Sequence, residues 1–279
     1  MDEAAVREAL ALEQGLKELI SSHAHITSVT VFPVLGSTND RAMLLEKENK
    51  PSGSLIITCA QDRGRGRMGR SWIMNRGDIA MSLILRPPHL PKNPVLLPMM
   101  SAVAICQGLK GLGIDARIKW PNDIVIKSSN KDERFSYFHS FLKVGGVLLE
   151  NVFHNSMLKA CILGIGLNVM PNEDTKRIVP HAGSLQDFVP SIHRMVALRA
   201  VLISLDNMIS NLAFPEFEEE LFRTYELHLV TLGQRVLVSL PSGQIEGLAI
   251  RLERDGSLVI LSDDREYSVF AGDVNSRKK

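Results

Sequence analysis

The apolar pattern of this chain changes abruptly near Gly233, and this change constrains the fold more than any other feature. Before it, Leu, Val and Ile at helical spacing predict two helices, over 193–212 and 215–227. After it, four short β-type runs are separated by Pro-Ser-Gly, Arg-Asp-Gly and Ser-Asp-Asp turns. We therefore predict two domains, 1–230 and 231–279, the second a small SH3-like β barrel.

The larger domain mixes helical and β-type patterns, which predicts an α+β fold. Three more helices are expected, over 4–20, 39–47 and 95–112. Strands are expected over 29–35, 54–60, 79–86, 116–119, 124–127, 144–152 and 159–169. The strands of the smaller domain are expected over 235–240, 245–252, 258–261 and 267–270. Two polar stretches, 128–134 and 172–177, are interpreted as surface loops.

Composition argues against several classes of protein. Of 279 residues, 45% are hydrophobic, which is enough for a full core. The net charge is +1, so the chain has no overall field to attract nucleic acid or a membrane. Cys59, Cys106 and Cys161 are widely spaced, which favours neither a disulfide framework nor a zinc site. The acidic, interrupted first 20 residues do not resemble a signal peptide, and no segment is apolar over a membrane-spanning length. A cytoplasmic protein is expected, with an organelle left open.

Four arginines fall within eight positions, at Arg63, Arg65, Arg67 and Arg70, and glycines alternate with them. Neighbouring guanidiniums about 8 Å apart repel by roughly 0.5 to 2 kcal/mol per pair, so the cluster is easier to explain with an anion present. The glycines let backbone amides approach phosphate or carboxylate oxygens. The alternatives are a solvated basic loop, an RNA-binding segment and a local salt-bridge patch. The RNA interpretation is disfavoured because the run is short and lies between strands.

Three further segments combine polar side chains with glycine or proline. The first, Lys-Trp-Pro-Asn-Asp at 119–123, presents a lysine, an amide and a carboxylate at a sharp connection, because proline interrupts strand pairing. The second is a lysine followed by Gly-Gly at 143–150, and the third is a glycine-rich strand ending at Asn168. Each is also explained by a simple turn or a β-bulge.

Considered together and in this order, the four segments resemble the biotin protein ligase family, also called holocarboxylase synthetases. The shared motifs are the GRGRxGR loop, KWPND, KxxGxLxE and the glycine-rich strand, and the resemblance covers most of 31–274. It implies a mixed-sheet, class II synthetase-like catalytic domain with a C-terminal SH3-like β-barrel. Nothing before Val29 resembles a helix-turn-helix, so a form without an N-terminal DNA-binding domain and without repressor activity is expected.

The resemblance implies a two-step, ATP-dependent reaction that forms a C–N bond. Biotin and ATP would form biotinyl-5′-AMP, and biotin would then pass to a lysine of the biotin carboxyl carrier domain of a biotin-dependent carboxylase, such as acetyl-CoA carboxylase. ATP, Mg²⁺ and biotin are therefore expected, without a fixed protein metal site, and neither nucleic acid nor a membrane is an expected partner. A homodimer is left open. The alternatives are a lipoate or octanoate ligase of the same fold and, with less support, an RNA-binding module.

The resemblance also assigns the site residues. Biotin is expected to contact Ser37, Thr38, Asn39, Gln61, Gly64, Arg65, Gly66, Arg67, Lys143, Gly145 and Gly146. ATP is expected to contact Arg67, Arg70, Trp72, Lys119, Asn122 and Asn168. The catalytic residues are expected to be Arg67, Lys143, Asp123 and Lys119.

Two of these assignments carry alternatives. Asp123 is expected to orient or deprotonate the incoming lysine, whose free pKa of about 10.4 leaves it mostly protonated. Asn122 or Asp123 is alternatively a position that helps to place Mg²⁺. One of the two tryptophans is expected to stack on adenine, whereas Trp120 is expected in the core. The insertion at 128–141 departs from the compact family pattern, and its role is left open.

Overall fold

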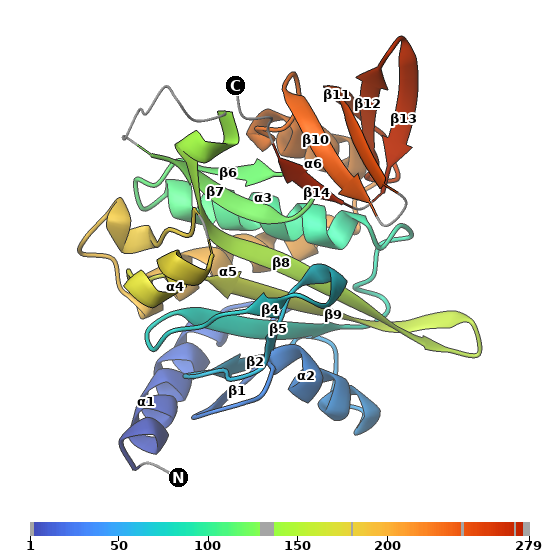
Figure 1. Ribbon diagram of the computed structural model, residues 1–279. Coiled ribbons are helices and arrows are strands. Elements are labelled where there is room, and N and C mark those ends of the chain that lie inside the picture. The colour runs from blue at the N-terminus through green and yellow to red at the C-terminus, as the bar shows by residue number, and fades with distance from the viewer. Residues whose placement is uncertain (1–2, 129–136, 180, 241–242, 271, 276–279) are drawn as a thin grey trace.

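Two sheets dominate the computed structural model, which describes residues 3–128, 137–179, 181–240, 243–270 and 272–275 (Figure 1). The larger sheet has seven strands in the order β1-β2-β5-β9-β8-β7-β6, and the C-terminal sheet has five in the order β13-β12-β11-β10-β14. Among the strands described for the larger sheet, β1 and β2 pair in parallel and the other neighbours pair antiparallel, so this sheet is mixed. The predicted α+β class is therefore confirmed.

The strands of the larger sheet agree closely with the predicted ranges. They are β1 (Ser28–Phe32), β2 (Ser54–Thr58), β5 (Ile79–Leu85), β6 (Ala116–Lys119), β7 (Asp123–Lys127), β8 (Phe141–His154) and β9 (Met157–Leu167). A separate two-stranded ribbon, β3 (Gly64–Arg65) and β4 (Ser71–Trp72), crosses in front of this sheet (Figure 1).

Helices cover the two faces of the larger sheet unequally. The helices on one face are α1 (Glu3–Ile20), α3 (Leu96–Lys110), α5 (Arg194–Asn211) and α6 (Phe217–His228). On the other face, α2 (Thr38–Lys47) packs over a small separate core that contains Leu45, Ile56 and Ile162. The β3–β4 ribbon lies in front of another part of that face, near β5 and β9 (Figure 1). No helix within the described ranges is long and apolar enough to cross a membrane.

The C-terminal sheet contains one strand more than the sequence predicts. Its strands are β10 (Arg235–Leu240), β11 (Gly243–Leu252), β12 (Leu258–Ser262), β13 (Arg265–Val269) and β14 (Asp273–Asn275). In the described part of the chain no pairing joins the edge strands β13 and β14, so the sheet is open there. Strand β14 has only three residues, too few for a periodic signal, yet it pairs with β10 through Val238 and Val274.

The interpretation of 172–177 as a loop is wrong, because a short helix, α4 (Glu173–Ile178), occupies this segment. The side chain of Asn172 accepts a hydrogen bond from the backbone N–H of Thr175 at 2.9 Å. Acids in its first turn and bases in its last turn complement the helix dipole. In the other predicted loop, Ser128 lies outside the strands, and 129–134 lies outside the described residues. The described residues also include three short 3-10 turns, at Arg67–Gly69, Tyr137–Ser140 and Leu185–Asp187.

Three histidines gather where the chain passes from α1 to β1. The Asp206 carboxylate accepts hydrogen bonds from the backbone N–H groups of residues 24–26 at 2.8 to 2.9 Å. This anchor leaves His23 and His25 partly buried, with the His25 ring edge-on to His89 at 5.0 Å between centroids. Burial lowers the pKa of His23, and burial, together with the neighbouring His25, lowers the pKa of His89.

These histidines predict that the protein is less stable in weak acid. A histidine whose pKa is lower in the folded than in the unfolded state stabilises the fold fully above the unfolded value of about 6.5, and this stability is lost as pH falls through the folded pKa. We expect His89→Gln to lessen the drop in Tm between about pH 7 and about pH 5 by about 2 °C or more, measured by calorimetry. His154→Gln, an exposed histidine on the β8–β9 hairpin, serves as the control. Identical pH profiles for wild type and His89→Gln would contradict this account.

Candidate active site

A cavity of about 360 Å³ lies on the sheet face that α2 leaves uncovered. Residues from α2, the β3–β4 ribbon, strands β5, β8 and β9, the turn between β6 and β7, and β14 line it. Segments far apart in the sequence therefore converge on one space. One end of the cavity, called the neutral end below, is lined mainly by the uncharged side chains of Ser37, Thr38, Asn39 and Gln61, and the other end gathers most of the cations.

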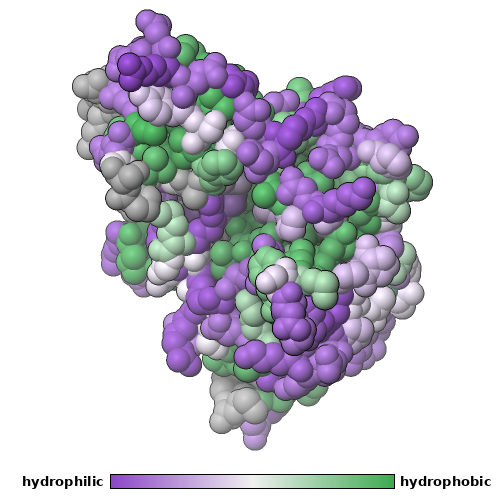
Figure 2. All heavy atoms as spheres, turned by 90° about the vertical axis from the view of Figure 1, so that its right-hand side faces the viewer, coloured by the Kyte–Doolittle hydropathy of each residue, from purple (hydrophilic) through white to green (hydrophobic). Residues whose placement is uncertain are grey.

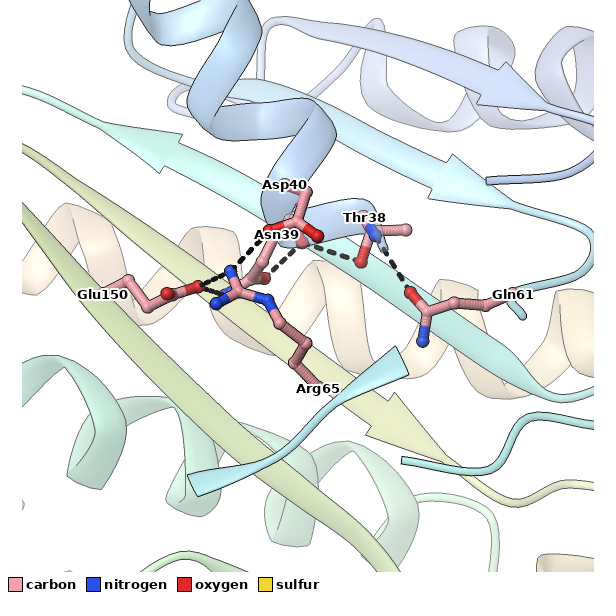
Figure 3. A network of polar contacts seen from close by, with 7 residues as sticks. Thr38, Asn39, Asp40, Gln61, Arg65 and Glu150 are labelled. Carbon is pink, nitrogen blue, oxygen red and sulfur yellow. Dashed lines mark hydrogen bonds and ion pairs between the residues drawn. The ribbon is translucent and has the colours of Figure 1, made fainter. Parts of the chain in front are cut away.

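The neutral end is a buried network of hydroxyl and amide groups (Figure 3). The backbone N–H of Thr38 donates to Gln61 Oε1 at 2.9 Å. The Ser82 hydroxyl lies 2.6 Å from Asn39 Oδ1 and 2.8 Å from Thr38 Oγ1. Asn39 Nδ2 donates to Glu150 Oε2 at 2.7 Å. Because these side chains hold one another in place, the network presents fixed donors and acceptors to a ligand.

Two glycines of β9 make room for this arrangement. A Cβ atom at Gly164 would overlap Asn39 Oδ1, and one at Gly166 would lie 2.5 Å from the Trp72 ring. A side chain at either position would therefore push Asn39 or Trp72 out of place. The glycine-rich strand shapes both the neutral end of the cavity and the position of the indole.

The arginine segment is an ordered hairpin in which two of the four guanidiniums are neutralised. Gly64 pairs with Trp72 across the β3–β4 ribbon, and Gly69 at the turn has a φ of 73°. Arg65 forms ion pairs with Asp40 at 2.8 Å and with Glu150 at 2.6 Å (Figure 3), and Arg70 pairs with Asp273 of β14. For Arg65 and Arg70 the salt-bridge alternative is confirmed.

Arg67 differs from its neighbours because it lies partly buried inside the cavity. Its guanidinium donates to Asn122 Oδ1 at 3.3 Å, and no ion pair to a carboxylate is found for it in the described part of the chain. Burial lowers its pKa, which the nearby Asp123 partly opposes. Burial also lowers the pKa of Lys119, whose Nζ lies 5.1 Å from the Phe138 ring centroid. Both cations are poorly solvated, so an anion in the cavity would stabilise them.

The Lys-Trp-Pro-Asn-Asp turn is fixed by helix α6 and the C-terminal sheet. The Trp120 backbone N–H donates to Thr231 Oγ1 at 2.9 Å, and its indole N–H donates to the carbonyl of Gly256 at 3.0 Å. The Tyr225 hydroxyl donates to the Pro121 carbonyl at 3.0 Å. Trp120 is 2% exposed, which confirms the expectation that it packs in the core.

The polar residues of this turn meet the lysine-glycine segment of β8. Asn122 Nδ2 donates to the Val147 carbonyl at 2.7 Å, and Lys143 Nζ forms an ion pair with Asp123 at 2.5 Å. Ile124 pairs with Gly145 and Val125 pairs with Lys143, so Val144 is an extra residue in β8. This β-bulge lies directly before Gly145-Gly146, as expected for a Gly-Gly pair in a strand. Lys143 Nζ also lies 5.8 Å from the Trp72 ring centroid. The lysine, the carboxylate and the indole therefore form one cluster.

Two buried polar atoms of the cavity lining have no hydrogen-bond partner among the described residues. They are Trp72 Nε1 and Asn168 Oδ1. A buried donor or acceptor without a partner costs about 1 to 3 kcal/mol, so each is a position where a ligand would restore a hydrogen bond.

The structure gathers nearly all predicted site residues around one cavity. Those that line it are Ser37, Thr38, Asn39, Gln61, Arg65, Gly66, Arg67, Arg70, Trp72, Lys119, Asn122, Asp123, Lys143, Gly146 and Asn168. Gly64 and Gly145 are buried behind its wall. Three residues contribute to the site without a role predicted from the sequence: Ser82, Glu150 and Asp273. Glu150 is the last residue of the KxxGxLxE motif at 143–150, Ser82 is an isolated hydroxyl in an apolar strand, and no local sequence pattern marks Asp273.

This chain is similar to known proteins that are biotin or lipoate protein ligases. A model of the Biotin/lipoate A/B protein ligase family matches residues 31–168. The chain is 29% identical to the Bacillus subtilis bifunctional ligase/repressor BirA over 247 residues, 86% of this chain and 71% of that protein. It is 28% identical to the biotin--[acetyl-CoA-carboxylase] ligase of Mycobacterium tuberculosis over 276 residues, 94% of each chain. The solved structure of a biotin protein ligase from Aquifex aeolicus in complex with biotin and ATP is similar with a TM-score of 0.72 and 25% identity, covering 90% of this chain and 99% of that one.

Proposed function

We propose that this chain is an ATP-dependent biotin protein ligase, because its residues 31–168 match the Biotin/lipoate A/B protein ligase family model. It forms biotinyl-5′-AMP from biotin and ATP, then transfers biotin to a lysine of a biotin carboxyl carrier domain. The relative from Mycobacterium tuberculosis, which carries acetyl-CoA carboxylase in its name, supports a carboxylase as the partner.

The observation that favours biotin over lipoate as the substrate is the buried polar network at the neutral end of the cavity. The biotin ureido group has two N–H donors and one carbonyl, which need fixed partners such as Thr38, Asn39 and Gln61. Lipoyl and octanoyl groups have no polar atoms there and would leave buried groups unpaired. The valerate chain then points the carboxylate toward Arg67.

In the first step, a biotin carboxylate oxygen attacks the α-phosphorus of ATP and pyrophosphate leaves. Two anions must meet, so the site has to supply positive charge at the phosphoryl oxygens. Arg67, Lys119 and Lys143 provide it. Trp72 offers a ring for adenine, and the unpaired Asn168 Oδ1 accepts a hydrogen bond from the nucleotide. These roles are proposals that rest on the positions of the residues around the cavity.

In the second step, Asp123 orients the incoming lysine amine and takes up a proton from it. Asp123 is paired with Lys143 at 2.5 Å, so it becomes available as Lys143 turns to the activated carboxyl group. Mg²⁺ usually binds one or two carboxylates together with substrate phosphates. As an alternative to the role of Asp123 in proton transfer, Asn122 or Asp123 in the cavity lining would help to place a metal that enters with ATP and neutralises phosphate charge.

We further propose that residues 1–230 form the catalytic domain and 231–279 an SH3-like domain that remains partly open. The anchoring of Trp120 by Thr231 and Gly256, and the Arg70–Asp273 ion pair, support a role for the smaller domain in shaping the nucleotide end. The RNA-binding alternative loses support because Arg65 and Arg70 are ion-paired to acids from other parts of the fold and Arg67 is partly buried. Arg63, 3.7 Å from Asp62, has the most exposed side chain of the four, at 85%.

Pyrophosphate release by the purified protein with ATP and Mg²⁺ tests this function. We expect release when biotin is added and not when lipoate or octanoate is added, because only biotin satisfies the polar network. Release with lipoate or octanoate but not with biotin would show that the protein is a lipoate or octanoate ligase. Absence of release with all three acids would reject the ligase assignment.

A further inference from the structure

A second cavity, of about 190 Å³, lies beside the first and has received no role so far. Its walls are mainly apolar and include Val95 and Met99 at the start of α3, Leu149 of β8, and Leu252 and Phe270 of the C-terminal sheet. Figure 2 views the molecule from the side toward which the β8–β9 hairpin projects in Figure 1. In this view, a hollow with apolar residues on its floor lies below the C-terminal sheet.

Strand β8 separates the two cavities, since its side chains alternate between its faces. Leu148 lines the first cavity and Leu149 the second, whereas Val147 touches both. The second cavity therefore lies on the opposite side of β8 from the proposed site of biotin and nucleotide. It does not extend the substrate pocket along the same face.

The two cavities meet at the reacting end of the first. Both are lined by Arg67, by the turn residues Trp120, Pro121 and Asn122, and by Val147. The hydrogen bond from Arg67 to Asn122 at 3.3 Å lies in this shared wall. The inner end of the second cavity is thus next to the place where the activated carboxyl group of biotinyl-5′-AMP would lie.

The charges along the second cavity have opposite signs at its two ends. Asp255 and Phe270 are exposed, which places them at the mouth, and Phe270 is 66% exposed. Hydrogen bonds from the Ser257 hydroxyl and backbone N–H hold the pKa of Asp255 below its usual value, so it is a carboxylate at neutral pH. The cation at the inner end is Arg67.

We propose that the second cavity is the channel by which the acceptor lysine reaches the adenylate. The proposal rests on the ligase function argued above. A lysine side chain combines an apolar stem of four methylenes with a charged tip, and the cavity combines apolar walls with a carboxylate at its mouth. Asp255 attracts the ammonium from solvent. Further in, desolvation between the apolar walls disfavours the ammonium and favours the neutral amine that must attack.

In the transfer step, every bond that forms and every proton that moves is accounted for. The lysine ammonium loses one proton to solvent, and the neutral nitrogen then attacks the carbonyl carbon of biotinyl-5′-AMP. A C–N bond forms, the bond from that carbon to the phosphate oxygen breaks, and AMP leaves with the electron pair. The nitrogen loses its second proton to Asp123, which passes it to solvent.

A substitution that fills the channel should slow the transfer step without affecting the formation of biotinyl-5′-AMP. Leu149→Trp should leave the rate of biotin-dependent pyrophosphate release in a single turnover unchanged. It should slow transfer to the probe Nα-acetyl-lysine methylamide by about 100-fold, because small misplacements of a nucleophile cost that much. Leu248→Trp is the matched control, a strand leucine 38% exposed and outside both cavities, and should alter neither rate.

A second variant tests the channel independently, in case Leu149→Trp does not fold. Asp255→Asn keeps an oxygen that can accept from Ser257 but removes the charge, so it should raise the KM for the lysine probe about threefold to tenfold and flatten its dependence on salt. Transfer at the wild-type rate by both variants would overturn the channel while leaving the ligase function intact. Absence of biotin-dependent pyrophosphate release from the wild type would instead overturn the ligase function, and the channel with it.

Discussion

Arg67→Ala is expected to lower the rate of biotin-dependent pyrophosphate release by about 100-fold to 1,000-fold, the usual cost of removing one preorganised donor to a charged transition state. Arg67 has the largest expected effect because it is partly buried and, within the described residues, forms no ion pair with a carboxylate. Its charge is therefore available to an incoming anion. Arg65 and Arg70, in contrast, already face carboxylates.

The matched control for this variant is Arg63→Ala. Arg63 belongs to the same arginine segment, but its side chain is largely exposed, 3.7 Å from Asp62. We expect its pyrophosphate release to stay close to that of the wild type. Equal losses in the two variants would indicate a general effect of loop charge and would contradict a specific role for Arg67.

Gly164→Ala is expected to raise the KM for biotin by about 10-fold to 100-fold, with little change in the KM for ATP. The added methyl group would overlap Asn39 Oδ1, so Asn39 would have to leave its contacts with Ser82 and Glu150. The polar network would then no longer present its donors and acceptors in one arrangement. Initial rates at varied biotin and fixed ATP measure the effect.

Gly111→Ala adds the same methyl group at the end of α3, where the new Cβ would lie 3.4 Å from the Gly108 carbonyl. This control should leave both KM values unchanged. An unchanged KM for biotin in Gly164→Ala would show that the network does not bind biotin. An equal rise in the KM for ATP would show instead that the substitution distorts the whole cavity.

The sequence predicted most of the fold because its longer elements carry local periodic signals. Strands such as β5 and β9 are buried apolar runs, and helices such as α1 repeat apolar residues at helical spacing, so their presence follows from neighbours along the chain. The short elements were missed for the same reason. Helix α4 has six residues and no apolar stripe, and β14 has three.

For the site, the sequence determined which residues are unusual, and the fold decided which of them remain available. Arginine and glycine at 63–70 indicated an anion site, but spacing alone could not tell Arg67 from Arg65 or Arg70. That difference arises from Asp40, Glu150 and Asp273, which lie far from the loop in sequence and reach it only in the folded chain.

What the sequence by itself determined is the α+β class, the change of pattern near Gly233 and the motifs of the family. What only the tertiary structure decided is the neutralisation of Arg65 and Arg70, the polar network through Ser82, and the second cavity behind β8. The physical reason is that periodicity and turn chemistry act between residues a few positions apart. The carboxylates that neutralise Arg65 and Arg70 lie 25, 85 and 203 positions away from them, beyond the reach of local sequence patterns.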